Sequence, residues 1–511
     1  MAQAQRNLLG AGLFLGLALM SGRLAGFGRE VLIASSFGLS AEADIAIILL
    51  SIPDLLVNLL LSGGISVALV PALRSADSDK AAALFLQATI VVGGGFAALA
   101  VIFAVAPTVW FYLLAPGALS PLRWLDNWMI YAIAAAIPLT AISGVSSAAL
   151  NSRDRFFVAG CGTLIFNLCI IGGLFYALAV GERYLSWLCV GILLGALVRW
   201  VVQLLALRVR LLPNRCGASC GWVLDQKLLL GFFAGLTSAS LLVIVPLLLR
   251  AGASWLGEGE LAAFNYAIKL IELPLGILIT TLATVAFPRL SEAHERQHIT
   301  AFNEILRVSL QRSVLLSIVI VMCGLAFIDA AISILFGAGQ IGIADLHHIT
   351  TLTQVALLSV PFVGISSLAA AAVNAQRRPG QVLRRTAAVM LLLPLLCIPG
   401  LWLKEPIVLM LALPIFHMML AINLARAAGE SVLKVGLGET YTFPLGVLVA
   451  VVVSVAILID FMFLKPAESW LVGPLAIWRL GLAGIAFGIS TVAILYVMRL
   501  QERVICNETD I

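Results

Sequence analysis

The stretch SGRLAGFGRE, residues 21–30, carries two arginines and a glutamate inside the first long apolar run of the chain. One charged side chain at the centre of a lipid-facing helix costs about 2.5–3.5 kcal/mol on insertion scales. Arg23, Arg29 and Glu30 therefore cannot all face acyl chains. They predict a helix that turns one face towards polar partners or water inside the protein.

The composition places this helix in a membrane. Of the 511 residues, 62% are hydrophobic and 11% are charged, whereas soluble domains carry about 25% charged residues. The chain is therefore predicted to be an all-α membrane protein. Its N-terminal apolar run continues as a full-length helix without a small-residue cleavage site, so we interpret it as a retained span rather than a cleaved signal.

Apolar runs of about 20 residues, the length that crosses a bilayer, recur along the whole chain. We place fourteen spans at residues 8–36, 43–70, 82–106, 124–149, 157–180, 185–207, 228–250, 259–287, 312–335, 350–373, 385–402, 405–426, 442–464 and 475–498. Residues 289–312 are predicted to form an amphipathic helix on the membrane surface. Arg199 lies near a span end and is predicted to extend its charge towards the interface.

The basic residues predict the orientation. Of the 31 Lys and Arg residues, 21 fall in loops and ends on the side of the N-terminus, 6 fall on the opposite side and 4 fall inside spans. Cytoplasmic loops are enriched in Lys and Arg. Both termini are therefore predicted to be cytoplasmic.

The chain contains an internal repeat. PLTAISGVSSAALNSRDR at 138–155 aligns without a gap with PFVGISSLAAAAVNAQRR at 361–378, and VPALRSA at 70–76 resembles FPRLSEA at 287–293. Parallel repeats of this kind are typical of transporters whose substrates bind between the halves. We predict two pseudo-symmetric six-helix lobes followed by two extra helices, with an N-lobe over 1–215, a C-lobe over 216–435 and a C-terminal part over 436–511.

Further charges lie in or beside later spans: Asp44, Asp54, Lys269 and Glu272. Seven such charges facing lipid would cost on the order of 20 kcal/mol, more than the stability of a typical fold. They are predicted to face one another or a water-filled cavity. Because cationic side chains bind phosphate groups, Arg23, Arg29 and Lys269 favour an anionic substrate. The alternative is that the charges only pair internally and hold the helices in register.

Other chemistries find little support. Cys216 and Cys220 have no nearby histidine, and His294 and His298 have no third ligand, so no metal site is expected. No glycine-rich phosphate loop and no aromatic-interleaved basic patch is present, which disfavours direct use of ATP and binding of nucleic acid. The predicted outer loops are short, and the longest contains no acidic residue. We therefore expect a transporter without cofactors rather than a glycosyltransferase or another enzyme.

Four segments resemble the MviN/MurJ family of lipid II flippases, which belongs to the multidrug/oligosaccharidyl-lipid/polysaccharide exporter superfamily: SGRLAGFGREVLIASSFGLSAEAD, IPDLL, GGISVALVP and YAIKLIELP. The resemblance implies an alternating-access flippase that moves an undecaprenyl-pyrophosphate-linked peptidoglycan precursor across the bacterial inner membrane. Its expected partners are this lipid-linked glycan and membrane lipids, with a monomer as the expected assembly. The candidate substrate-binding residues are Arg23, Arg29, Glu30, Asp44, Asp54, Asn58, Lys269 and Glu272.

The chain departs from the family pattern at several charged positions. Asp54 replaces an asparagine, and Val57, Asn58 and Ser62 stand where the family often has two arginines and an acidic residue. Ile268 replaces an acidic residue before the cation of the eighth span. These departures leave a different lipid-linked exopolysaccharide unit as an alternative substrate. A cation-coupled multidrug antiporter is a further alternative, and the sequence leaves the coupling ion open.

Overall fold

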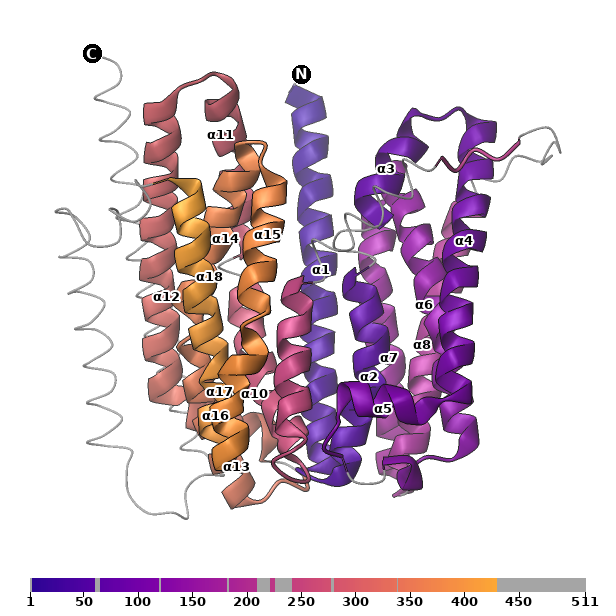
Figure 1. Ribbon diagram of the computed structural model, residues 1–511. Coiled ribbons are helices and arrows are strands. Elements are labelled where there is room, and N and C mark those ends of the chain that lie inside the picture. The colour runs from indigo at the N-terminus through magenta and orange to yellow at the C-terminus, as the bar shows by residue number, and fades with distance from the viewer. Residues whose placement is uncertain are drawn as a thin grey trace. The chain divides into compact units, whose positions relative to one another are not determined.

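The computed structural model describes residues 2–59, 65–118, 121–181, 183–208, 221–225, 241–276, 280–337 and 339–429, with the side chains of the first helix described from Met20 onwards. Every regular element in these ranges is a helix. The chain divides into two compact units, Met1–Asn265 and Tyr266–Ile511 (Figure 1). The lobe boundaries at 215 and 435 stay predictions.

The first unit holds long helices joined by short connections. They are α1 (Ala2–Phe37), α2 (Ala41–Leu59), α3 (Ile65–Ser75), α4 (Ser78–Val105), α5 (Pro107–Leu114), the 3-10 turn η2 (Pro121–Trp124), α6 (Asn127–Ser152), α7 (Phe156–Val180), α8 (Tyr184–Arg208) and Leu241–Ala253. The helix α10 (Glu260–Pro274) begins in this unit and continues into the second. The second unit then contains α11 (Thr280–Glu295), α12 (Ile299–Phe336), α13 (Ile343–Leu357), α14 (Val360–Ala375), α15 (Pro379–Met390), α16 (Leu393–Leu403), α17 (Pro406–Met410) and α18 (Ala412–Ala428).

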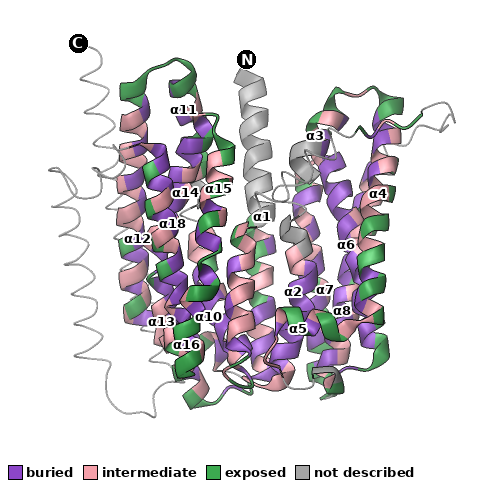
Figure 2. Ribbon diagram, viewed as in Figure 1, coloured by how far each residue is buried: buried purple, intermediate pink, exposed green. Residues whose placement is uncertain are grey.

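Helix α6 forms the centre of the first unit. It packs against α2, α3, α4, α7 and α8, and its segment AISGVSSAAL at 141–150 is almost entirely buried. Lipid gives no hydrophobic drive for helix association, so membrane helices rely on small residues that let backbones approach closely. Figure 2 shows the result as a largely buried α6 beside α4, which keeps a mostly exposed face.

Glycines set the close crossing of α7 and α8. A Cβ atom at Gly191 would lie 2.8 Å from the Cα of Ile170, and one at Gly173 would lie 2.5 Å from the carbonyl oxygen of Trp187. Backbone atoms cannot move aside as a flexible side chain does. The glycines are therefore required for the contact that positions α7, which carries part of the candidate site.

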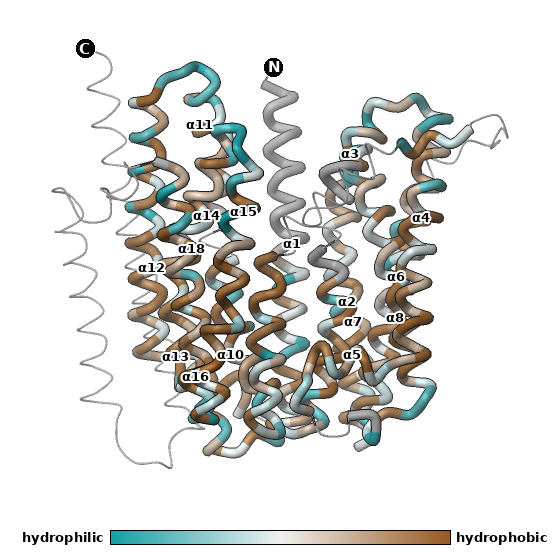
Figure 3. Tube along the Cα trace, viewed as in Figure 1, coloured by the Kyte–Doolittle hydropathy of each residue, from teal (hydrophilic) through white to brown (hydrophobic). Residues whose placement is uncertain are grey.

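The second unit is built around α14, which packs against α11, α12, α15 and α18. Figure 3 shows hydrophobic residues along the lengths of the helices and hydrophilic residues at connections such as the one between α11 and α12. This distribution is the one expected of helices that cross a bilayer.

The two segments of the sequence repeat adopt the same backbone. Asp154 after α6 and Arg377 after α14 both have φ of 58°. The amide of Asp154 donates to the carbonyl of Asn151, and the amide of Arg377 donates to the carbonyl of Asn374. One helix further on, Gly181 and Lys404 again take positive φ, 80° and 55°. Both pairs are separated by the offset of 223 residues at which the sequences align.

Several predicted spans have a different form in the structure. The described residues contain eight helices long and apolar enough to cross a membrane. The second predicted span contains α2 and α3, and the eighth contains α10 and α11, while residues 60–64 and 277–279 lie outside the described ranges. The spans at 442–464 and 475–498, and most of 228–250, lie outside the described residues, so the number fourteen stays a prediction.

The prediction of a single amphipathic helix over residues 289–312 is wrong. A turn with Gln297 at φ of 57° separates the end of α11 from the start of α12. The amide of His298 donates to the carbonyl of Ala293, which closes this turn. No proline interrupts residues 299–336, so the amphipathic segment and the next span form one 38-residue helix.

The α7–α8 crossing predicts a stability difference between two glycine substitutions. Gly191→Val should lower the free energy of unfolding by about 1–3 kcal/mol because the added methyl groups overpack the crossing. Gly172→Val is the matched control, since a Cβ atom there meets nothing within 4 Å. Denaturation of the detergent-solubilised protein measures both. Equal losses for the two variants would show that the crossing is not tightly packed.

Candidate functional site

The site is a network of charged and polar side chains around Arg29, which is only 3% exposed. Its Nη2 atom lies 2.7 Å from Asp54 Oδ2 and 2.6 Å from Glu30 Oε1. Its Nη1 atom donates to Asp54 Oδ1 at 3.2 Å and to Asn167 Oδ1 at 3.0 Å. Asp54 thus accepts both branches of the guanidinium, the two-pronged geometry that gives arginine–carboxylate pairs their strength. Three helices, α1, α2 and α7, meet at this one cation.

The glycines of the opening sequence make this meeting possible. The Nδ2 atom of Asn167 donates to the carbonyl oxygen of Gly22 at 3.1 Å. A Cβ atom at Gly26 would lie 3.2 Å from the same Nδ2, and one at Gly22 would lie 3.3 Å from Thr163 Cβ. Gly22 and Gly26 are four residues apart and share one face of α1. That smooth face lets α7 approach closely enough for Asn167 to reach Arg29.

The second oxygen of Glu30 extends the network to α10. Asn265 Nδ2 donates to Glu30 Oε2 at 2.8 Å, and Asn265 Oδ1 accepts from Arg250 Nη1 at 3.0 Å. The same Nη1 lies 3.0 Å from the hydroxyl oxygen of Ser51. Glu30 is therefore held from both sides and is 3% exposed. The network links α1 and α2 to the helix 241–253 and to the first turns of α10.

Asp44 makes a separate contact with the start of α10. Its two carboxylate oxygens accept the backbone amides of Gly259 and Ala262, each at 2.8 Å. The free amides at a helix N-terminus carry partial positive charge and favour an anionic partner. Gly259 has φ of 82°, and a Cβ atom there would lie 2.7 Å from the carbonyl carbon of Leu39. Asp44 in α2 thus caps a helix that begins more than 200 residues later.

The comparisons with known proteins agree with one another. A family model described as Lipid II flippase MurJ matches residues 33–480. The chain belongs to the lipid II flippase MurJ family. The lipid II flippase MurJ of Burkholderia cenocepacia is 26% identical over 373 residues, which cover 68% of this chain and 69% of that protein. The probable lipid II flippase MurJ of Buchnera aphidicola is 26% identical over 337 residues and is matched over 62% of its own length.

Solved structures share the fold of this MurJ-family chain. A lipid II flippase MurJ in an inward closed conformation has a TM-score of 0.78 at 20% identity, covering 96% of this chain and 100% of that one. An inward-facing multidrug resistance transporter of the MATE family has a TM-score of 0.68 at 11% identity, covering 84% of this chain. These likenesses show a fold shared with both transporters, and the family match makes the chain a multi-pass membrane protein.

The prediction that Arg199 extends its charge towards the membrane interface is wrong for this MurJ-family chain. Arg199 does not extend towards the interface, because it is 1% exposed and enclosed within the first unit. Its Nε and Nη1 atoms have no hydrogen-bond partner among the described residues. A Cβ atom at Gly162 would lie 2.9 Å from its Nε, so this glycine makes room for the guanidinium. The carboxylate of Asp54 attracts Arg199 electrostatically.

Charge balance explains how a MurJ-family chain tolerates this cation. Arg29 meets two carboxylates, Glu30 and Asp54, and Asn265 links Glu30 to a second cation, Arg250. Asp54 provides Arg199 with a nearby negative charge. A buried charge without a balancing partner is strongly destabilising. We interpret Arg199 as the distant counter-charge of Asp54, although no ion pair joins the two.

The other predicted residues have different environments. The side chain of Arg23 is exposed. Lys269 pairs with Glu272 in the second unit, with 2.8 Å between Nζ and Oε2. The side chain of Asn58 lies outside the described residues. Their assignment to a substrate site stays a prediction, as does that of the network residues Arg29, Glu30, Asp44 and Asp54.

Sequence reasoning missed the uncharged and distant members of the network. Asn167 stands in the middle of a strongly apolar span, and such a polar residue is itself a functional signal. Asn265 and Arg250 gave a weaker signal, because they lie close to span ends. Among the described residues, no three His, Cys, Asp or Glu side chains gather as a metal site.

The charge balance predicts coupling between Asp54 and Arg199. Each single change, Asp54→Asn or Arg199→Gln, removes one partner of the attraction between the two side chains, whereas the double variant removes both. The two effects on the free energy of unfolding should be non-additive by about 0.5–3 kcal/mol in favour of the double variant. Denaturation of the four purified proteins measures this coupling. Additive effects would mean that Arg199 is balanced elsewhere.

Proposed function

We propose that this protein is a flippase that moves lipid II, the lipid-linked peptidoglycan precursor, from the cytoplasmic to the periplasmic leaflet of the bacterial inner membrane. The observation that carries the proposal is the family match over residues 33–480, with curated relatives named as lipid II flippases. The buried basic and acidic side chains of α1 and α2 give this fold a chemical reason to handle a diphosphate. In this proposal both termini are cytoplasmic and the protein acts as a monomer.

In this proposal the arginines of α1 have different tasks. The exposed Arg23 makes the first contact with the pyrophosphate of the substrate. The two terminal nitrogens of Arg29 are occupied by Asp54, Glu30 and Asn167, so this fork binds phosphate only when a carboxylate leaves. Asp54 is the partner that leaves, because its side chain is 30% exposed whereas that of Glu30 is 4% exposed and tied to Asn265. The diphosphate thus competes with Asp54 for the fork of Arg29.

The remaining candidate residues divide into binding and gating groups. Lys269 supplies a further cation for the substrate, and Glu272, paired with it, holds its ammonium until substrate arrives. Asn58 contributes a polar group on α2. Glu30 and Asp44 fix the first turns of α10 to α1 and α2, so both contacts change when the transporter alternates between its two states.

A different lipid-linked glycan is the second candidate substrate. Asp54 and Val57 stand where the family pattern has neutral and basic residues, and these changes alter the charge offered to a substrate. The pyrophosphate requirement is the same for both substrates. A multidrug antiporter is less well supported, because the MATE likeness at 11% identity concerns the fold alone.

Complementation tests the proposal. In a strain depleted of its essential lipid II flippase, the wild-type chain should restore growth, because it supplies the missing translocation. Arg23→Ala and Arg29→Lys should each abolish rescue. Lysine keeps the charge of Arg29 but loses the two-pronged contact, so loss of rescue by this variant points to the geometry of the guanidinium rather than to charge alone.

The matched control is Arg296→Ala, which removes an exposed arginine that follows α11 and pairs with Glu292 in the last turn of that helix. It should support normal growth, since exposed pairs of this kind contribute about 0.3–0.5 kcal/mol. Immunoblots of membranes verify that all variants insert. Normal growth with both Arg23→Ala and Arg29→Lys would contradict the arginine-based mechanism, and no rescue by well-expressed wild type would favour another lipid-linked sugar.

A further inference from the structure

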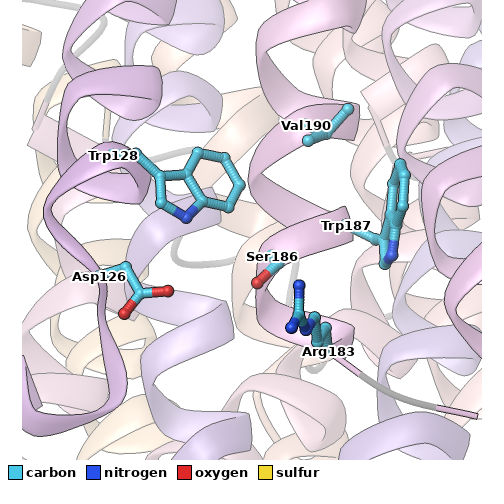
Figure 4. A pocket seen from close by; sticks show the side chains of 6 residues that line it. All are labelled: Asp126, Trp128, Arg183, Ser186, Trp187 and Val190. Carbon is cyan, nitrogen blue, oxygen red and sulfur yellow. The ribbon is translucent and has the colours of Figure 1, made fainter.

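A pocket of about 470 Å³ lies on the first unit where α6 and α8 begin, away from the Arg29 network (Figure 4). Its lining residues come from the starts of these two helices and the turn before α8: Asp126, Trp128, Arg183, Ser186, Trp187 and Val190. We call it the α6–α8 pocket. Both helices enter the apolar layer at this point, so the pocket lies at the boundary between membrane and water.

Two opposite charges line the α6–α8 pocket without meeting. Figure 4 shows Asp126 and Arg183 approaching it from different sides. Within the described residues, neither side chain has a hydrogen bond or an ion pair. Asp126 precedes the first residue of α6, yet its carboxylate does not cap that helix. Both charged groups are therefore available to a ligand.

The backbone holds Arg183 in an unusual conformation. Its φ is 61°, in the left-handed region that strains a non-glycine residue and often marks functional positions. Arg183 directly precedes α8, and its carbonyl accepts the amide of Trp187 in the first turn. The backbone conformation of Arg183 thus determines the position of its guanidinium relative to the pocket.

Two tryptophans give the α6–α8 pocket the character of a lipid interface. Trp128 is 42% exposed, and Trp187 packs against Tyr176 with 4.3 Å between ring centroids. Tryptophan and tyrosine concentrate at the level of lipid head groups, where an apolar ring meets a polar edge. The indole rings also offer faces that attract a cationic ammonium group.

An apolar stripe continues from the pocket along α8. After Val190, the exposed residues Leu194, Leu197, Val201 and Leu205 follow at spacings of three and four, which places them on one face of the helix. From 194 to 205 the stripe is about 16 Å long at 1.5 Å per residue. One leaflet of the hydrocarbon core is about 15 Å thick. The stripe therefore matches the length of one acyl chain.

We propose that the α6–α8 pocket binds the head group of a zwitterionic glycerophospholipid of the phosphoethanolamine type. Arg183 binds the phosphate, Asp126 binds the ammonium beside the ring of Trp128, and one acyl chain lies along the α8 stripe. The pocket carries one positive and one negative charge, so it matches a neutral zwitterion better than a lipid with net negative charge. This site is separate from the network around Arg29.

Native mass spectrometry of the purified full-length protein in detergent tests this proposal. The probes are 1-palmitoyl-2-oleoyl phosphatidylethanolamine, the phosphatidylglycerol with the same acyl chains, and soluble phosphoethanolamine. The wild type should bind the first lipid more tightly than the second. Arg183→Gln should weaken binding of both lipids at least tenfold, because the phosphate loses its cation. Asp126→Asn should reverse the preference towards phosphatidylglycerol.

Two further variants separate this site from general lipid adsorption. Arg123→Gln, which removes a nearby arginine that stacks on Trp124 rather than lining the pocket, should bind like wild type. Leu194→Ser should weaken binding of both lipids without changing the preference between them. Equal binding of the two lipids by wild type and Asp126→Asn would overturn the proposal. Displacement of the lipid by equimolar soluble phosphoethanolamine would also overturn it, since the acyl chain would then contribute nothing.

Discussion

A guanidinium enclosed by membrane helices is stable only if its counter-charges are enclosed with it, and this requirement organises the first unit around Arg29. Glu30 is the next residue on the same helix, Asp54 reaches in from α2, and Asn167 completes the shell from α7. None of these contacts forms unless the helices come close. The glycine pair on α1 and the glycines between α7 and α8 are therefore part of the electrostatics as much as of the packing.

The charge pattern of the sequence anticipated part of this site. Arg29, Glu30 and Asp54 were grouped because lipid could not solvate them, and the structure brings these three together. Arg199 was misjudged, since a long side chain near a span end resembles one that reaches for water. Burial depends on the neighbouring helix, and a single sequence does not show that Gly162 leaves a space for this guanidinium. Asn167 and Asn265 were missed because an uncharged amide costs less in lipid than a charge and is easily overlooked.

The sequence predicts the helical fold and the internal repeat well, but it predicts the positions of the helix ends less well. Hydropathy locates an apolar run without showing where the chain bends. The turn at Gln297 arises from a local backbone conformation inside an otherwise helical pattern. The role of Asp44 could be predicted only in part. Its position in the first turn of α2 was visible, whereas its partners at the start of α10 are contacts between residues far apart in the chain.

The matching turns after α6 and α14, and again one helix later, show what the internal repeat preserves. Helix α7 is continuous, while the equivalent stretch is split into α15 and α16, yet both begin and end at the same offset. The thickness of the bilayer sets the distance between successive reversals of the chain. Side chains and even helix continuity differ between the two repeats, whereas the spacing of the reversals is the same. The repeat is thus clearer in where the backbone changes direction than in which residues it carries.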